Sequence, residues 1–341
     1  MRLDLVLEPA SPGVFAELGL LAERLGFGNV WTANHIAARD PFMSFMPLAA
    51  RSQRIGMGPI AISPYELHPV KIANQLLTLN EAAQGRARVV IGGGGGTVIG
   101  LGMKPGRRAM MPRMVRAVRE AVELVRGAAT GRLFSYDGEL FSVANYQASW
   151  TADLPPPMLY VGASKPQMLR MAGRVADGVM MSDVTLPRIA EAMAALTGSL
   201  HEQGRTEYFP VSNLYAWHVF PDRAQALAEA RAKLFVRGML EDWYISPFLD
   251  AAECAQVEAS FNAFAMAYAR NSPVIEGVPD ALVEKLVENL TFVGTPQDVD
   301  QITEELLAFK AAGLNEFAIR LYAEPAAAMQ LIAERVMPAL A

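Results

Sequence analysis

The chain has 341 residues, 52% of them hydrophobic, and a formal net charge of −5 at pH 7. This length and apolar content suit one α/β barrel with insertions, and the mild negative charge argues against a nucleic-acid partner. No apolar run reaches the roughly 18–20 residues of a membrane span, and the single cysteine, Cys254, excludes an internal disulfide and a cysteine-based metal cluster. The N-terminus reads as a strand and not as a signal peptide, so we expect a cytoplasmic enzyme.

Short runs rich in aliphatic residues recur along the chain, and each is followed by a helical pattern. The runs that we expect to be strands are residues 3–7, a run that begins with 29–31, and residues 55–62, 88–91, 158–161, 178–181, 211–220 and 316–321. Apolar residues at helical spacing come after the proline-containing starts at 11–12, 68–69 and 295–296. Eight strand–helix units predict a closed parallel (β/α)8 barrel, the TIM barrel, because an open doubly wound sheet has about six strands.

Two insertions interrupt this repeat within a single domain that spans 1–341. Residues 128–157, after strand four, carry a predicted hairpin at 132–143, and residues 236–292, between strands seven and eight, are predicted to be helical. In a barrel such insertions either wall the active site or make a subunit contact, and the sequence leaves both open. Either a wall of the substrate pocket or core packing accounts for the aromatic residues of the second insertion, which are Trp243, Tyr244, Phe248, Phe261, Phe264 and Tyr268.

The functional groups of a (β/α)8 barrel lie where strands run into the following loops. Strand one ends near Glu8, and strand two ends at Asn34 and His35. His35 is the best acid–base candidate of the four histidines because it lies at such a junction, although a lone histidine is more often structural than catalytic. Asn34 does not titrate, so it acts only through hydrogen bonds.

Two further junctions suit a flat ligand and a phosphate. The glycines at 92–96 lack the helix spacing and the acidic residue of a dinucleotide-binding fingerprint, so they either admit a flat ligand close to the backbone or form a bare turn. Residues 162–165 either offer backbone N–H groups and a cation to an anion or simply begin a helix. No residues have the spacing of a metal site. The arginines at 107, 108, 113, 116 and 119 are expected on a solvated helix face.

Taken together, these junctions resemble the bacterial luciferase-like superfamily, and within it the methylenetetrahydromethanopterin reductase branch, which uses the deazaflavin coenzyme F-420. The resemblance rests on the order and spacing of segments that cover nearly the whole chain except 236–290, namely residues 22–28, 31–35, 58–69, 74–94, 160–178 and 293–296. One of them contains the pattern Leu-Arg-x-Ala-Gly-x-x-Ala-Asp-Gly at 169–178.

The resemblance implies a homodimer with its active site at the barrel mouth, where His35 donates or accepts a proton and Asn34 and Glu8 lie beside it. It also implies a non-prolyl cis peptide between Ile60 and Ala61, behind the deazaflavin ring. FMN is the alternative cofactor because it too ends in a phosphate, which 162–165 would bind. The residues that the resemblance assigns to the cofactor are Asn34, Ile60, Ala61, Ser63, Gly92, Gly93, Gly94, Gly162, Ala163, Ser164, Lys165 and Ser182.

Two residues depart from the family's pattern. Asn34 stands in place of an aspartate, and Thr97 stands where the sugar-phosphate dehydrogenase branch has a catalytic glutamate, so oxidation of glucose 6-phosphate is not expected. We expect hydride transfer between coenzyme F-420 and an organic substrate. If the aromatic insertion lines the substrate pocket, that substrate is bulky and apolar or aromatic. The alternatives are a reduced-FMN-dependent monooxygenase and a non-catalytic flavin-binding relative.

Overall fold

The computed structural model describes residues 1–8, 10–94, 96, 100–102, 104, 107–151, 153–205 and 207–341. Its central feature is a ring of parallel strands, hydrogen-bonded in the order β3-β2-β1-β11-β9-β8-β7-β4. Bridges from Met57 to Ala87 and from Ile62 to Ile91 bring β3 and β4 together and close the ring. The strands are β1 (Arg2–Val6), β2 (Asn29–Ala33), β3 (Gly56–Ile60), β4 (Arg88–Ile91), β7 (Met158–Gly162), β8 (Gly178–Ser182), β9 (Val211–Val219) and β11 (Glu316–Arg320). They coincide with the eight predicted strands, and the (β/α)8 barrel is confirmed.

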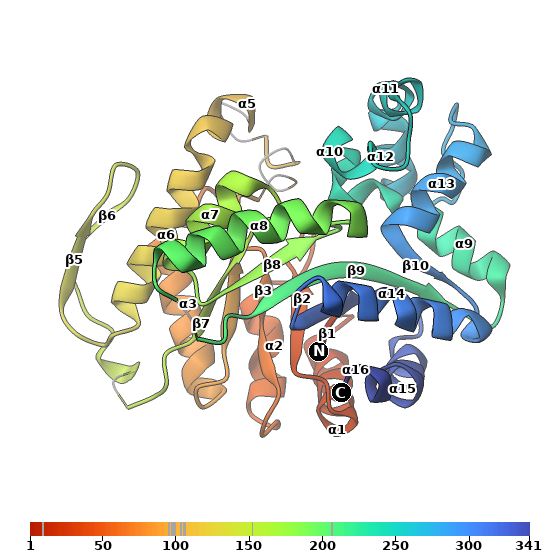
Figure 1. Cartoon of the computed structure of the whole chain (residues 1–341). Helices are drawn as coiled ribbons and strands as arrows, with labels where there is room; N and C mark the ends of the chain where they lie inside the picture. The colour runs from red at the N-terminus through yellow and green to blue at the C-terminus, as the bar shows by residue number, and fades with distance from the viewer. Residues whose placement is uncertain are drawn as a thin grey trace.

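Helices surround this ring, and the two chain ends lie side by side below it (Figure 1). Ser11 begins the first helix by accepting a hydrogen bond from the Val14 N–H at 3.2 Å, and Gly26 ends it at a φ of +91°. The helices that come after the barrel strands are α1 (Pro12–Leu25), α2 (Pro41–Ala49), α3 (Pro69–Ala82), α6 (Met114–Ala128), α7 (Pro166–Val175), α8 (Leu186–Glu202), α9 (Arg223–Ala232) and α15 (Pro325–Arg335). Helix α14 (Val299–Ala311) leads into β11, and the short helices α5 (Arg107–Met110) and α16 (Met337–Leu340) precede α6 and end the chain.

Polar side chains fill the end of the barrel at which the strands begin. Asp4 accepts hydrogen bonds from the Asn29 side chain at 2.6 Å and from the Trp31 indole at 3.1 Å, and Glu316 accepts one from the Tyr160 hydroxyl at 3.1 Å. Above this layer the barrel is packed with apolar side chains, which are Val6, Trp31, Ile60, Val90, Tyr160, Met180, Leu214 and Ala318. Because this end is filled, ligands have access at the opposite end, where the strands finish.

Both predicted insertions are present. The first contains the antiparallel hairpin β5 (Phe134–Asp137) and β6 (Ser142–Tyr146), which lies at the far left of Figure 1 and ends three residues later than predicted. The second is helical, with α10 (Asp242–Ile245), α11 (Ala251–Ala259), α12 (Phe261–Ala269) and α13 (Asp280–Leu290) at the upper right. It ends in a strand that was not predicted, β10 (Thr291–Gly294), which pairs in parallel with the second half of β9. No helix among the described residues is long and apolar enough to cross a lipid bilayer.

Candidate active site at the barrel mouth

The ends of β1, β2 and β11 bring an acid, an imidazole and a guanidinium together. Glu8 and His35 each lie two residues beyond their strand, and Arg320 is the last residue of β11. Arg320 Nη2 contacts Glu8 Oε1 and lies 2.8 Å from His35 Nε2, while Glu8 Oε1 lies 3.4 Å from the same ring nitrogen. The sequence predicts Glu8 and His35 at this site. Arg320 was missed, although an arginine at the end of an otherwise apolar buried strand is a signal that would have found it.

Opposite charges keep Glu8 and Arg320 ionised despite their burial. Burial by itself opposes ionisation of Glu8, but its contact with His35 and the charge of Arg320 outweigh burial and lower the pKa of Glu8 to about 2. Burial also opposes the charge on Arg320, yet Tyr322 and Glu8 hold the pKa of that guanidinium above its usual range. The His35 side chain, 35% exposed, therefore faces a permanent carboxylate–guanidinium pair while remaining open to the mouth.

Asn34 connects the loops that follow β2 and β3. Its Nδ2 donates to both carboxylate oxygens of Glu66, at 3.0 and 2.8 Å, and its backbone N–H donates to the Ile60 carbonyl at 2.7 Å. The amide therefore faces an acid that was not predicted as part of the site. The role of Asn34 at a ring edge stays a prediction.

The predicted cofactor residues after β3, β4 and β7 lie against one another. The Ser63 hydroxyl donates to the Gly93 carbonyl at 3.1 Å, and a Cβ added to Gly94, whose φ is +66°, would lie 2.5 Å from Ser63 Cβ. A Cβ on Gly92 would lie 3.1 Å from that of Ala61. Glycine is thus required here both by backbone conformation and by space. Gly95 and Thr97 lie outside the described residues.

The proposed phosphate-binding segment lies where β7 and β8 end. Ser164 Oγ accepts a hydrogen bond from the Ser182 N–H at 3.2 Å and donates to the Ser182 carbonyl at 3.3 Å. Lys165 immediately precedes α7, and its ammonium group lies 2.5 Å from a carboxylate oxygen of Glu241. The structure therefore brings two of the residues assigned to the cofactor, Ser164 and Ser182, together and pairs the lysine with an acid of the second insertion.

A buried ion pair also joins the second insertion to the mouth. Arg237 Nη1 lies 2.9 Å from Asp183 Oδ1, and both side chains are 1% exposed. The other Asp183 oxygen accepts hydrogen bonds from the Ser182 hydroxyl at 2.6 Å and the Gly238 N–H at 3.0 Å. Arg237 Nη2 donates to the Tyr322 hydroxyl at 3.2 Å, and Tyr322 lies against Arg320, 5.0 Å from its guanidinium carbon. A continuous polar network therefore links the ends of β8 and β11.

A cavity of about 520 Å³ opens beside Glu8, between α9, the second insertion and the loop after β11. Lys233 lines it, donating to Asn271 Oδ1 at 2.6 Å and lying over the rings of Tyr322 and Tyr268 at 5.3 and 5.6 Å. Burial lowers the pKa of Lys233. Charged and polar side chains share the lining with Ala228, Ala232, Pro273 and Ala323. This mixed lining does not distinguish a polar from an apolar substrate.

The six aromatic residues named in the second insertion are not among the residues that line the cavity beside Glu8. Tyr244 and Phe264 are buried core residues, whereas Phe261 is 36% exposed. Tyr268 comes closest to the cavity beside Glu8, through its contact with Lys233. Core packing therefore explains the most buried members of the set.

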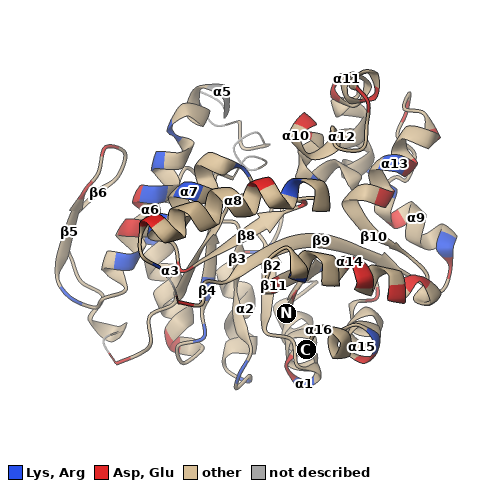
Figure 2. Cartoon of the chain, viewed as in Figure 1, with Lys and Arg blue, Asp and Glu red and all other residues tan. Residues whose placement is uncertain are grey.

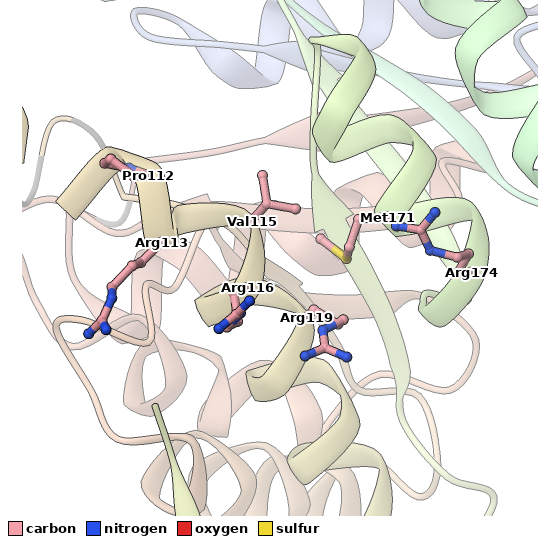
Figure 3. Close-up of a pocket in the computed structure, with 7 residues that line it drawn as sticks. All are labelled: Pro112, Arg113, Val115, Arg116, Arg119, Met171 and Arg174. Atoms are coloured by element: carbon pink, nitrogen blue, oxygen red, sulfur yellow. The ribbon is translucent and has the colours of Figure 1, made fainter. Parts of the chain in front are cut away.

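Another cavity, of about 600 Å³, lies outside the barrel between α6 and α7 and is lined by arginines 113, 116, 119 and 174 (Figure 3). Basic residues are visible along these helices in Figure 2. Glu139 pairs with Arg113 and Arg116, and Arg119 lies 3.7 Å from Glu123. Carboxylates thus balance Arg113, which directly precedes α6, and Arg116 and Arg119 within it, as expected for a solvated helix face, and we assign this cavity no ligand.

A parallel eight-stranded barrel with acid, imidazole and guanidinium groups at its C-terminal mouth has the architecture of a (β/α)8 enzyme. No group of three His, Cys, Asp or Glu side chains in the described part of the chain is arranged to hold a metal ion. The chain belongs to the luciferase-like monooxygenase family, whose model matches residues 4–316. The resemblance noted in the sequence is thereby confirmed.

Similar proteins include oxidoreductases with either deazaflavin or flavin cofactors. The chain is 27% identical over 332 residues to the 5,10-methylenetetrahydromethanopterin reductase of Archaeoglobus fulgidus, covering 94% of this chain and 93% of the relative. Its fold is similar to that of the coenzyme F-420-dependent tetrahydromethanopterin reductase from Methanopyrus kandleri, with a TM-score of 0.80 at 20% identity over 100% and 99% of the two chains. The fold is also similar to that of the oxygenating constituent of 3,6-diketocamphane monooxygenase from Pseudomonas putida in complex with FMN. The TM-score is 0.68 at 17% identity, over 99% of this chain and 98% of the other.

Proposed function

We propose that the chain is an oxidoreductase that uses coenzyme F-420 to transfer a hydride to or from a small organic substrate at the barrel mouth. The observation that carries this proposal is the accessible His35 imidazole, held by the Glu8–Arg320 pair at the strand ends where (β/α)8 enzymes place their chemistry. The reductase of Archaeoglobus fulgidus, which aligns along nearly the whole chain, supports the same reaction class.

The residues at the mouth fit a flat cofactor with a phosphate. The added-Cβ distances are tight at Gly92 and prohibitive at Gly94, so these glycines leave a floor of bare backbone that a planar ring can approach, beside Ile60, Ala61 and Ser63. The phosphate would be held by 162–165, through backbone N–H groups and the Ser164 hydroxyl, with Lys165 shared between the phosphate and Glu241. When bound, coenzyme F-420 supplies a carbon that gives or takes a hydride in a two-electron step.

The protein's own residues position the substrate and act on its reacting atom. The Asn34–Glu66 hydrogen bonds fix the two loops that border the ring site, and His35 is the group that we place at that atom, either to exchange a proton with it or to donate a hydrogen bond to it. The cavity beside Glu8 would hold the rest of the substrate, with Lys233 available to its polar groups. Coenzyme use, a homodimeric state and a cytoplasmic location belong to this proposal. Sedimentation at micromolar concentration tests the dimer, which should have twice the 36.9 kDa mass of the chain.

A reduced-FMN-dependent monooxygenase is the second candidate. It is favoured by the family's description and by the FMN-bound structure with the same fold. The proposed phosphate-binding segment does not distinguish the two cofactors because both carry a phosphate.

Titration of the purified protein with coenzyme F-420 and with FMN, followed by fluorescence, separates these functions. We expect tight binding of coenzyme F-420 and weak binding of FMN. A preference for reduced FMN with oxygen uptake would establish the monooxygenase instead. Binding of either cofactor without turnover on a panel of carbonyl and alcohol substrates would indicate a non-catalytic relative.

Replacing His35 tests its assignment. His35→Ala should lower turnover by about 100-fold or more while changing cofactor affinity little, because general acid–base groups contribute roughly 10²–10⁴-fold to rate. His201→Ala is the matched control, since His201 is an exposed residue of α8. Unchanged turnover in His35→Ala would remove His35 from the mechanism without affecting the cofactor assignment.

A further inference from the structure

Both polar contacts of the His35 ring fall on the same nitrogen, Nε2. Arg320 Nη2 lies 2.8 Å from it and Glu8 Oε1 lies 3.4 Å from it. The described residues leave Nδ1 without a hydrogen-bond partner. We propose that Arg320 is a positioning residue that fixes His35 as the neutral tautomer with its proton on Nδ1. The ring then acts toward the substrate as a hydrogen-bond donor and not as a proton acceptor.

The chemistry of the guanidinium determines the direction of the short contact. An arginine side chain has N–H donors and no acceptor, so a nitrogen 2.8 Å from Nη2 must supply a lone pair. Nη2 has two hydrogens, one for Glu8 and one for His35, so both contacts can form at once. A proton on Nε2 would point two N–H groups at each other. The ring proton therefore belongs on Nδ1.

The competing arrangement is an imidazolium that donates from Nε2 to Glu8. Its distance of 3.4 Å is long for a charge-assisted hydrogen bond, and Glu8 already accepts a shorter one from Arg320. Glu8 and Arg320 are the charged groups that face Nε2, from the loop after β1 and from β11. Because Glu8 is already neutralised by the closer Arg320 guanidinium, it does little to stabilise a positive charge on the His35 ring.

Other contacts keep Arg320 in this position. Its side chain is 7% exposed, and its guanidinium carbon lies 5.0 Å from the centre of the Tyr322 ring, whose hydroxyl accepts a hydrogen bond from Arg237. Arg320 Nε is buried without a partner among the described residues, so the side chain is held by its contacts at Nη2 and its stacking. A group fixed in this way can impose one tautomer on a more exposed imidazole.

This tautomer narrows the class of substrate, an inference that rests on the proposed function. A neutral imidazole whose Nε2 is engaged can give up its Nδ1 proton only by becoming an anion, so it polarises the substrate instead. Addition of a hydride to a carbonyl carbon moves the π electron pair to oxygen, where a donor at Nδ1 stabilises the developing charge and solvent supplies the proton. Oxidation of an alcohol needs a proton acceptor. The geometry therefore favours a carbonyl compound as the substrate, reduced by the deazaflavin.

Nitrogen NMR of protein labelled at histidine tests the tautomer without cofactor or substrate. The His35 signals are identified by their loss in His35→Gln. In the wild type we expect a neutral ring with its proton on Nδ1 at neutral pH, and in Arg320→Met a mixture of tautomers or the Nε2–H form. Arg320→Lys, which keeps one charged donor, should partly restore the Nδ1–H form. Arg335→Met, an exposed arginine of α15, is the control.

Two NMR results would overturn the proposal. One is an Nε2–H or doubly protonated ring in the wild type at neutral pH, which needs no variant to fold. The other is an unchanged Nδ1–H signal in Arg320→Met. Failure to bind coenzyme F-420 would overturn the proposed function and leave the tautomer result intact.

Kinetics then test the direction of the reaction. With a ketone and its alcohol as probes, reduction of the ketone by the reduced form of coenzyme F-420 should outpace oxidation of the alcohol by the oxidised form. His35→Gln should lower the reduction rate by about 100-fold, as expected for losing an oxyanion donor. Faster oxidation in the wild type, with a rate that rises as His35 loses a proton, would contradict the carbonyl assignment.

Discussion

Asn34 stands where the resemblance to the deazaflavin-dependent branch implies an aspartate, and its neighbour shows why an amide suits this chain. Its Nδ2 donates to both oxygens of Glu66, at 3.0 and 2.8 Å. An aspartate in this position would place two carboxylates in contact, and two such groups cannot both stay ionised without repulsion. The substitution that weakens the analogy with deazaflavin-dependent relatives thus creates a hydrogen bond between two loops of the mouth. Asn34 is therefore better explained by Glu66 than by His35.

Asn34→Asp should therefore destabilise the protein at neutral pH. We expect a loss of about 1–2 kcal/mol in the free energy of unfolding, the size of a like-charge contact at a partly exposed site. The loss should shrink at acidic pH, where one of the two carboxyls binds a proton. Urea denaturation at the two pH values measures it. The double variant Asn34→Asp with Glu66→Gln restores a donor–acceptor pair and should recover most of the stability; no recovery would contradict the explanation.

The glycines after β4 shape the mouth through one constrained position. Gly94 has a φ of +66°, and a Cβ there would lie 2.5 Å from Ser63 Cβ. Gly94→Ala should lower the free energy of unfolding by about 1–3 kcal/mol, the cost of a strained backbone position, and weaken F-420 binding as Ser63 shifts. Gly198→Ala in α8, where nothing lies within 4 Å, is the control and should be neutral or slightly stabilising. Equal effects in the two variants would refute the close-packing argument.

Helix α14 carries a carboxyl that makes stability depend on pH. Burial alone raises the pKa of Glu305 to about 7, from an ordinary value of 4.5. Since the folded-state pKa is the higher one, the protonated form stabilises the fold fully below the unfolded pKa, and this contribution is lost as pH rises through about 7.

Glu305→Gln mimics the protonated side chain at every pH. It should leave stability unchanged below about pH 4.5 and raise the free energy of unfolding by about 3 kcal/mol at mildly alkaline pH, given about 1.4 kcal/mol for each pKa unit between 4.5 and about 7. Thermal unfolding across this pH range measures the effect. Glu304→Gln, at the exposed neighbouring position of the same helix, should show no such dependence. A similar pH dependence in both variants would count against burial as the cause.

The elements that were predictable are those whose pattern is local. Runs of buried residues bounded by helix starts identified all eight barrel strands, and Thr295 together with Pro296–Asp298 forms the expected capped entry to α14. Strand β10 was missed because it exists only by pairing with the second half of the nine-residue β9. Residues 217–219 of β9 extend beyond the register shared with β8 and β11, which no local pattern reveals.

The same distinction separates the parts of the site. Glu8 and His35 were predictable because a barrel places every strand end at one mouth. Arg320 carried the same signal, as the last residue of β11, and was missed. Glu66 and Arg237 were not predictable, since each acts through a partner far away in sequence and the pairing depends on how loops pack. The Asp183–Arg237 pair joins residues from β8's end and the second insertion, and nothing in either segment alone indicates the other.

The Asp183–Arg237 pair determines how firmly the second insertion is held on the barrel. Both side chains are 1% exposed, and Asp183 also receives the Gly238 N–H. Removing one member of such a pair leaves a buried charge without a partner, which costs about 3–5 kcal/mol. Arg237→Met should therefore lower the free energy of unfolding by that amount and increase hydrogen exchange of the amides in 236–292.

The double variant Arg237→Met with Asp183→Asn tests this cause. It removes both charges and leaves an amide oxygen for the Gly238 N–H, so it should recover at least half of the lost stability and the slow exchange of the insertion. Arg270→Met is the control within the insertion, because Arg270 and its partner Glu276 are 64% and 84% exposed and 3.9 Å apart. Such a pair contributes less than about 1 kcal/mol. If Arg237→Met exchanged no faster than Arg270→Met, the insertion would be held by its apolar contacts, and the ion pair would serve the mouth alone.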